Sequence, residues 1–289
     1  VVVGGTGYIG SAIVEAIARR GDSPVVVSPS APDDLPPGAE ARTGDARDPE
    51  ALATIVGSAD AVIYAAAPMG DWDADTVAVS AIMQKLAGTD RPFVYTSGIW
   101  SLGAAAQYAG EPADDDAATD ALPISIGRPA LERLVVDAAA EGIRTATLRP
   151  GIVYGRAGGI PSMLVGWARE NGSGRYVGSD PGLRWPMVHV DDLADAYLLV
   201  LDRGRAGSLV NVTAQDGVAV GSLAEAADRA AGGSGVATSW AYDDAVETLG
   251  KPFADALVHD QVISSPRVRA LGWTPRHVDA VADLAGEPA

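Results

Sequence analysis

The glycine-rich segment Gly4-Gly5-Thr6-Gly7-Tyr8-Ile9-Gly10 constrains the fold of this chain more than any other feature. The apolar run 1–3 before it predicts a buried strand, and residues 11–20 after it predict a helix with isoleucines on one face. At such a junction one glycine permits a tight turn, a second lets the backbone approach a pyrophosphate, and a third lets helix and strand pack closely. We therefore expect a Rossmann-type α/β domain that binds a nicotinamide dinucleotide.

The helix after this loop would point its unpaired N–H groups and the positive end of its dipole at the phosphates of the dinucleotide. The alternative is a glycine-rich turn without a ligand, but three spaced glycines at a strand–helix junction favour the cofactor. We expect six loop residues to contact it, namely Gly4, Thr6, Gly7, Tyr8, Ile9 and Gly10.

The rest of the pattern predicts a doubly wound parallel sheet, because strands and helices alternate along the first half of the chain. Asp48-Pro49-Glu50 combines a capping acid, a tolerated proline and a favourable glutamate, so it predicts a helix start. The acidic stretch 109–122 predicts a surface loop. The expected strands are 24–28, 61–66, 93–97, 145–149, 187–190 and 209–213, and the expected helices are 75–87, 131–140, 163–171, 191–201 and short alanine-rich segments beyond 222.

Two lobes are expected from this order of elements. The dinucleotide-binding domain comprises residues 1–155, and the strand and helix at 187–213 return to it. A smaller, mostly helical C-terminal lobe comprises residues 156–186 and 214–289 and would bind the substrate. A chain of 289 residues, 47% of them hydrophobic, is long enough for one large domain with such a lobe.

Composition excludes several classes of function. A net charge of −17 argues against a nucleic-acid-binding surface, which needs clustered lysine and arginine. With no cysteine and three histidines, neither disulfides nor an ordinary metal site is expected. No apolar run is long enough to cross a bilayer and no secretory signal is found, so we expect a cytoplasmic protein with a small-molecule substrate and no membrane partner.

Six further segments occur in an order that is typical of one superfamily. They are Gly44-Asp45-Ala46-Arg47-Asp48, Ala65-Ala66-Ala67, Thr96-Ser97-Gly98, Leu148-Arg149-Pro150-Gly151-Ile152-Val153-Tyr154-Gly155, Val188-His189-Val190-Asp191-Asp192 and Leu271-Gly272-Trp273-Thr274-Pro275. With the Gly-x-x-Gly-x-x-Gly spacing of the loop, they resemble the short-chain dehydrogenase/reductase superfamily, in particular its extended, epimerase/dehydratase-like branch. The resemblance spans nearly the whole chain.

The resemblance implies a role for each segment. Residues 44–48 would contact the adenine, 65–67 would pass along the cofactor, and 148–155 would reach the nicotinamide. Ser97 would stand in the turn that carries the active-site serine. The residues that the resemblance places beside the cofactor are Asp45, Ala46, Ala65, Ala66, Ala67, Pro150 and Gly151.

The end of the second strand decides between NAD and NADP in this fold. A carboxylate there binds the ribose of NAD, whereas an arginine neutralises the 2′-phosphate of NADP. This chain has Ser28 and Ser30 instead. Their hydroxyls can bond a 2′-phosphate, which favours NADP slightly over NAD. The alternative is that both serines only shape a turn.

The catalytic Tyr-x-x-x-Lys pair of the superfamily is missing. The only lysines are Lys85 and Lys251, and neither follows a tyrosine by four residues. In the family a glutamate commonly follows the lysine by four; counting back from Glu132 puts Arg128 at the lysine position and Ile124 at the tyrosine position. The chain therefore resembles atypical members of the superfamily that keep the glycine loop but lack the tyrosine.

Arg128 and Ser97 are the candidates that remain for catalysis. Arginine stays protonated, so Arg128 can donate to the ribose hydroxyls of the cofactor but cannot replace the tyrosine as a proton donor. Ser97 follows a strand end, where open α/β sheets hold their ligands, although it could instead bond the backbone of its turn.

The substrate candidates are less specific. Trp100, Tyr154, Arg184 and His189 are expected near the substrate, with packing or surface roles as the alternatives. Trp100 belongs to a set of tryptophans that could form an aromatic pocket, and Arg184 could meet an anionic group. Tyr108 lies in a loop that could fold over the cleft.

Three functions stay open at this point. The first is an atypical oxidoreductase that acts on a small carbonyl or alcohol. The second is a lyase, isomerase or cyclase on the same fold, and the third is a binding protein that senses the dinucleotide without chemistry. A homodimer through the helices 75–87 and 131–140 is a further expectation, since such pairing is common in the superfamily.

Overall fold

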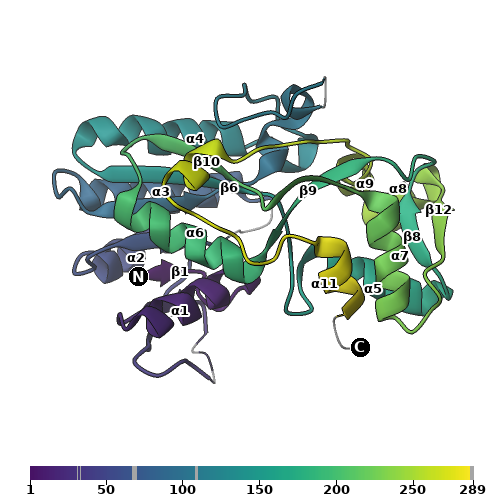
Figure 1. The fold of residues 1–289 in the computed structure, drawn as a ribbon. Helices are drawn as coiled ribbons and strands as arrows, with labels where there is room; N and C mark the ends of the chain where they lie inside the picture. Colours follow the sequence, from purple (N-terminus) through teal and green to yellow (C-terminus); the bar gives the residue numbers. More distant parts are fainter. Residues whose placement is uncertain (31, 33, 67–69, 108–109, 287–289) are drawn as a thin grey trace.

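The large sheet organises the structure. The computed structural model describes residues 1–30, 32, 34–66, 70–107 and 110–286, and within these ranges it has a seven-stranded, a three-stranded and a two-stranded sheet (Figure 1). All strand pairs of the large sheet are parallel, as predicted. In spatial order its strands are β10 (Ser208–Val212), β6 (Arg144–Pro150), β5 (Pro92–Thr96), β4 (Val62–Tyr64), β1 (Val2–Val3), β2 (Val25–Ser28) and β3 (Glu40–Thr43).

Helices cover both faces of this sheet (Figure 1). Consecutive strand residues point to opposite faces, so Val2 and Ile63 pack in one apolar cluster while their neighbours Val3 and Tyr64 pack in another. The first cluster lies under α1 (Tyr8–Arg20) and α6 (Val190–Arg203), and the second under α2 (Pro49–Val56), α3 (Trp72–Leu86) and α4 (Arg128–Asp137). The doubly wound fold predicted from the alternating elements is confirmed.

The strand order reverses between β1 and β4. The glycine loop follows β1 and residues 65–66 follow β4, so both loops leave the carboxyl edge of the sheet at this switch point. Ligands of open α/β sheets bind at such a point. The fold therefore places the glycine loop where a dinucleotide would bind.

The second lobe contains both strands and helices (Figure 1). Its three-stranded sheet comprises β7 (Ile152–Tyr154), β9 (Arg184–His189) and β11 (Gln215–Ala219), and its two-stranded sheet pairs β8 (Gly174–Val177) with β12 (Ala237–Trp240). Its helices are α5 (Gly159–Asn171), α7 (Val220–Ala230), α8 (Tyr242–Leu249), α9 (Lys251–Leu257) and α11 (Ala280–Gly286). Their apolar sides share one buried cluster that includes Leu164, Trp185 and Leu223.

The chain crosses between the lobes more than once. β10 rejoins the large sheet beside β6, as expected. β9 pairs with β7 and β11. The short helix α10 (Pro266–Ala270) packs through Val268 against the large-sheet core, and Trp273, just after this helix, joins the same core. Partners far away in sequence decide these placements, and no local pattern encodes them.

Local signals predicted most of the elements correctly. Asp48 caps α2 by accepting from the N–H of Ala51 at 3.0 Å, and a helix and a strand occupy the expected segments around 131–140 and 145–149. The strands β3, β7, β8, β11 and β12 lie outside the expected strand segments. The surface loop predicted at 109–122 includes the buried Asp115, which accepts from the N–H groups of Asn211 at 2.6 Å and Arg267 at 2.9 Å.

Gly10 gives the first test of the fold. A Cβ on Gly10 would lie 2.1 Å from the carbonyl oxygen of Gly4, and this backbone atom cannot move without opening the loop. We expect Gly10→Ala to lower the free energy of unfolding in urea by about 1–3 kcal/mol. Gly166→Ala is the matched control, because Gly166 also lies in a helix and its Cβ would meet no atom within 4 Å. The control should gain about 0.5–1 kcal/mol, and equal stability of the two variants would contradict the packing role.

Candidate active site

The glycine loop is tightly packed against the turn after β4. Gly4 has φ of +79°, and a Cβ there would lie 2.6 Å from the backbone nitrogen of Ala66. A hydrogen bond from the N–H of Gly7 to the carbonyl of Gly4, 3.0 Å long, closes the loop. Thr6 and Gly7 are exposed at its tip. Glycine at positions 4 and 10 is thus a packing requirement of this junction.

The start of α1 suits a phosphate group. Its N-cap Gly7 has no side chain to accept from the first N–H groups, and the first turn carries no acidic residue. By contrast, α2 and α3 begin at Asp48 and Asp71, whose carboxylates accept from Ala51 and Ala74. The positive end of the α1 dipole is therefore left for a ligand anion, which is consistent with a dinucleotide at the glycine loop.

Residues expected around the adenosine half lie at the same edge of the sheet. Ser28 is buried at the end of β2, and its hydroxyl donates to the carbonyl of Ser30 at 2.6 Å, whereas Ser30 itself is exposed. Asp45 accepts from the N–H of Arg47 at 2.9 Å and so shapes its own turn. Ala46 and Ala65 are half-buried beside these loops. Of the other expected residues, Ala67 and Tyr108 lie outside the described residues.

A cleft of about 630 Å³ opens between the two lobes at the carboxyl edge of the large sheet. It brings together seven of the expected site residues: Tyr8, Ile9, Ser97, Trp100, Arg128, Pro150 and Gly151. Ile124, at the expected tyrosine position, also lines it. The remaining walls are mostly apolar and comprise Gly70, Trp72, Gly98, Ile99, Pro123, Ser125, Ile152, Val153, Gly159, Ile160 and Pro252.

Two of these wall residues carry no recognisable sequence signal. Ile160 lies in the first turn of α5 and Pro252 in the first turn of α9, and both belong to the second lobe. Their approach to the glycine loop depends on how the lobes pack. Tyr8 contributes to this packing, since its hydroxyl donates to the carbonyl of Gly155 at 2.8 Å.

Arg128 begins α4 and lines the cleft beside Trp72, whose ring centroid lies 5.3 Å from the guanidinium carbon. Its Nη1 donates to the hydroxyl of Tyr95 at 2.6 Å and to the carbonyl of Thr96 at 2.7 Å. The same nitrogen lies 3.8 Å from Oδ2 of Asp75, whose side chain is 1% exposed. The cation at the expected lysine position thus has a buried carboxylate as its partner.

Asp75 is held by two tyrosines beneath the cleft. It accepts from the hydroxyl of Tyr64 at 2.6 Å and, more weakly, from that of Tyr95 at 3.4 Å. Burial raises the pKa of Asp75 above its ordinary value, and the Tyr64 hydrogen bond and the Arg128 charge oppose this shift. Burial also raises the pKa of both tyrosines, so their hydroxyls stay protonated and donate to the carboxylate.

The hydroxyl of Ser97 points away from the cleft toward a buried ion pair. It donates to Oε1 of Glu132 at 2.5 Å, while Arg149 donates to both carboxylate oxygens, at 3.0 and 2.5 Å. All three residues are buried. The next residue, Gly98, has no atom within 4 Å of its missing Cβ. The cleft wall after β5 therefore has open space at Gly98, and the proton of Ser97 is already engaged.

The four expected substrate residues are not together. Trp100 lines the cleft and packs edge-on against Phe253 with ring centroids 6.2 Å apart. Arg184 forms an ion pair of 2.6 Å with Asp260 and lines a different cavity of about 620 Å³. Tyr154 packs edge-on against His189 with ring centroids 5.1 Å apart, and both belong to a network at the junction of the lobes.

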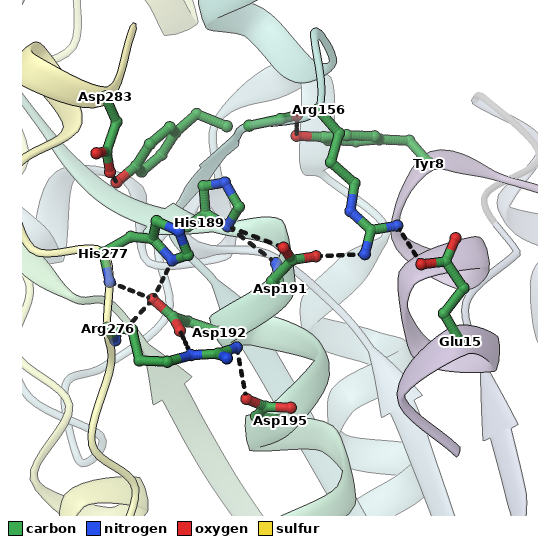
Figure 2. A network of polar contacts seen from close by, with 12 residues as sticks. Tyr8, Glu15, Arg156, His189, Asp191, Asp192, Asp195, Arg276, His277 and Asp283 are labelled. Atoms are coloured by element: carbon green, nitrogen blue, oxygen red, sulfur yellow. Dashed lines mark hydrogen bonds and ion pairs between the residues drawn. The ribbon is translucent and has the colours of Figure 1, made fainter. Parts of the chain in front are cut away.

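Figure 2 shows this network around His189. Its ring stacks on His277 with centroids 3.7 Å apart, and its Nδ1 accepts from the N–H of Asp191 at 3.2 Å. His277 lies 3.1 Å from a carboxylate oxygen of Asp192, and Tyr154 donates to Asp283 at 2.9 Å. These contacts attach the C-terminal segment to β7 and α6.

Arg156 extends the network to the glycine-loop helix (Figure 2). It lies 2.8 Å from Glu15 of α1 and 2.6 Å from Asp191 of α6. Arg156 and Ala157 both have positive φ, 54° and 53°, which is rare for residues with a side chain. The two ion pairs hold this turn beside Tyr8, so the network supports the cleft from outside.

The sequence profile of the NAD dependent epimerase/dehydratase family matches residues 1–213. The chain belongs to this family. Its membership agrees with the superfamily resemblance of the motifs, although the chain contains no Tyr-x-x-x-Lys pattern.

Two kinds of relatives were found. An uncharacterized protein of Schizosaccharomyces pombe is 26% identical over 99% of this chain and 98% of its own length. The structure resembles UDP-glucose 4-epimerase of Thermus thermophilus in complex with NAD, with a TM-score of 0.79, 21% identity and coverage of 99% and 98% of the two chains. It also resembles a dTDP-glucose 4,6-dehydratase of Streptomyces venezuelae, with a TM-score of 0.80, 19% identity and coverage of 98% and 94%. The structural likenesses show a shared fold.

Within the described part of the chain, no helix has the length and apolar character needed to cross a membrane. No group of three or more His, Asp or Glu in this part of the chain is arranged to hold a metal ion.

The histidine stack predicts how stability depends on pH. Burial and the neighbouring His277 lower the pKa of His189 below its ordinary value of 6.5. The unfolded chain therefore binds a proton at His189 more readily than the folded chain, and stability falls as the pH drops below about 6.5. His189→Asn keeps an acceptor for the N–H of Asp191 without a titrating ring. Thermal unfolding between pH 7.5 and 5 should show a shallower loss for this variant, and parallel curves would contradict the assignment.

Proposed function

We propose that this chain is a nicotinamide-dependent oxidoreductase that acts on a small carbonyl or alcohol and holds the substrate oxygen by hydrogen bonds from Arg128. Family membership, the capless start of α1 and the packing of Gly4 and Gly10 support cofactor binding. The observation that carries the proposal is Arg128 itself, the charged side chain that lines the cleft beside Ile124. When bound, the nicotinamide would supply or take up the hydride.

Arg128 would act on the substrate oxygen. Among the described residues, its hydrogen bonds all come from Nη1, which leaves Nε and Nη2 as donors for a ligand. Tyr95 and Thr96 hold the guanidinium in place, so donation to a developing alkoxide needs little reorganisation. Because arginine stays protonated near neutral pH, the proton that completes the alcohol would come from water. The ribose hydroxyls are an alternative ligand for the same donors.

The other predicted residues would have supporting roles. Pro150 and Gly151 line the cleft where the nicotinamide would lie. Ser97 would hold the turn after β5 in place through its hydrogen bond to Glu132. We keep a slight preference for NADP, which rests on Ser30, because the hydroxyl of Ser28 already donates to the carbonyl of Ser30. Titration of both cofactors, reduced and oxidised, tests this preference directly.

Substitution of Arg128 tests the reaction. Loss of one donor to a transition-state oxyanion lowers kcat by about 100- to 1000-fold, so we expect such a fall for Arg128→Met in the oxidation of NADPH or NADH with a panel of neutral carbonyls. Arg133→Met is the control, since Arg133 lies exposed on the same helix. An active wild type whose rate survives Arg128→Met would overturn the role of Arg128.

A second function is favoured by the chemistry of the cleft wall. Ile124 has no proton to give, and the proton of Ser97 is engaged by Glu132. These features would suit a protein that binds the dinucleotide and reports its redox state without turnover. Tight cofactor binding with no oxidation by any carbonyl, together with different affinities for the reduced and oxidised forms, would support the sensor. Equal affinities for the reduced and oxidised dinucleotide would contradict the sensor function.

A further inference from the structure

The charges around the cleft affect which substrates it can bind. Among the cleft-lining residues that the structure describes, Arg128 is the only Asp, Glu, Lys, Arg or His. The remaining walls are apolar or uncharged, with Trp72, Trp100 and Ile124 among them. Whether the cleft attracts anions therefore depends on the electrostatic environment of Arg128.

Asp75 compensates the charge of Arg128 from below. Its Oδ2 lies 3.8 Å from Nη1 of Arg128, and Tyr95 connects the two groups by accepting from the arginine and donating to the carboxylate. Tyr64 donates to the other oxygen at 2.6 Å. A carboxylate this deeply buried interacts strongly with a neighbouring cation, because solvent screening is weak there. The pair presents hydrogen-bond donors to the cleft with little net charge.

Two arginines outside the cleft have acidic partners. Arg156 pairs with Glu15 and Asp191, and Arg184 pairs with Asp260. The chain as a whole carries a net charge of −17. Once the phosphates of a dinucleotide occupy the start of α1, a substrate with a pyrophosphate or a carboxylate would enter an apolar cleft without a free counter-charge, and desolvation of its charge would oppose binding.

We propose that the cleft selects an uncharged substrate with an apolar body, and that Asp75 is the residue that sets this preference. The proposal rests on the proposed function in one respect, since the substrate oxygen is placed at Arg128. The structural neighbours named above carry sugar-nucleotide names. For this chain, UDP-glucose would be a poor ligand.

A matched pair of probes tests the preference. Methyl benzoylformate and benzoylformate share the phenyl ring and the ketone and differ in the charge of one group. Binding is followed by quenching of tryptophan fluorescence, since Trp72 and Trp100 line the cleft, and the oxidised dinucleotide is present at saturation so that the anion site at the start of α1 is filled. We expect the wild type to bind the ester at least tenfold more tightly than the acid and more tightly than UDP-glucose. Equal or tighter binding of the acid or of UDP-glucose would overturn the proposal.

Asp75→Asn then tests the source of the preference. It removes the compensating charge with little change in size, so affinity for benzoylformate should rise at least tenfold while affinity for the ester changes little. Asp73→Asn is the matched control, because Asp73 is an exposed acid on the same helix, and it should behave as the wild type. An unchanged ratio of affinities in Asp75→Asn would exclude Asp75 as the determinant.

A double variant covers the case in which Asp75→Asn fails to fold. Asp75→Asn with Arg128→Met removes both charges, so no buried ion is left unpaired. If the native pair is compensated, this variant should keep the wild-type ratio of ester to acid. A further tenfold loss of acid binding would show that Arg128 still attracts anions in the native protein, against the proposal.

These binding measurements separate the inference from the proposed reaction. A preference for the ester without turnover of any carbonyl would leave the substrate class in place and remove the oxidoreductase. Turnover that depends on Arg128, with tighter binding of the acid, would support the oxidoreductase and remove the proposed substrate class.

Discussion

The close contact between Gly10 and the carbonyl of Gly4 is the constraint on which the site depends. Without Cβ atoms at positions 4 and 10, α1 starts directly against β1 and the turn after β4. This packing places the start of the helix at the point where the strand order reverses. The same junction receives Tyr8, which bonds Gly155 of the second lobe. The close contact of these two glycines thus positions both the start of α1, where a dinucleotide would bind, and Tyr8, which contacts the second lobe.

Two buried ion pairs then determine the chemistry of the cleft. Glu132 and Arg149 join α4 to β6 and engage the hydroxyl of Ser97. Asp75 joins α3 to the start of α4 through Arg128. A buried charge without a partner is costly, so removal of one member of either pair is expected to destabilise the folded protein. Both carboxylates lie behind the cleft wall, and we interpret the low net charge of the cleft as a consequence of Asp75.

Much of the fold was predictable because its signals are local. The glycine spacing, the cap at Asp48 and the apolar runs each predicted an element that the structure contains. The predictions failed where a distant partner decides. Asp115 was assigned to a surface loop, yet the backbone of Asn211 and Arg267 buries it. The expected grouping of Tyr154, Arg184 and His189 with Trp100 also depended on tertiary packing, and the structure places only Trp100 in the cleft.

The sequence by itself determined the family and the absence of a tyrosine–lysine pair, because both depend on residue types at short, regular spacings. It also predicted that Arg128 occupies the lysine position. Only the tertiary structure decided what Arg128 does there, since its partners Asp75 and Tyr95 come from α3 and β5. Parallel strands and the helices between them bring these residues together by packing. The charge of a cleft is a property of that packing, and no spacing in the sequence encodes it.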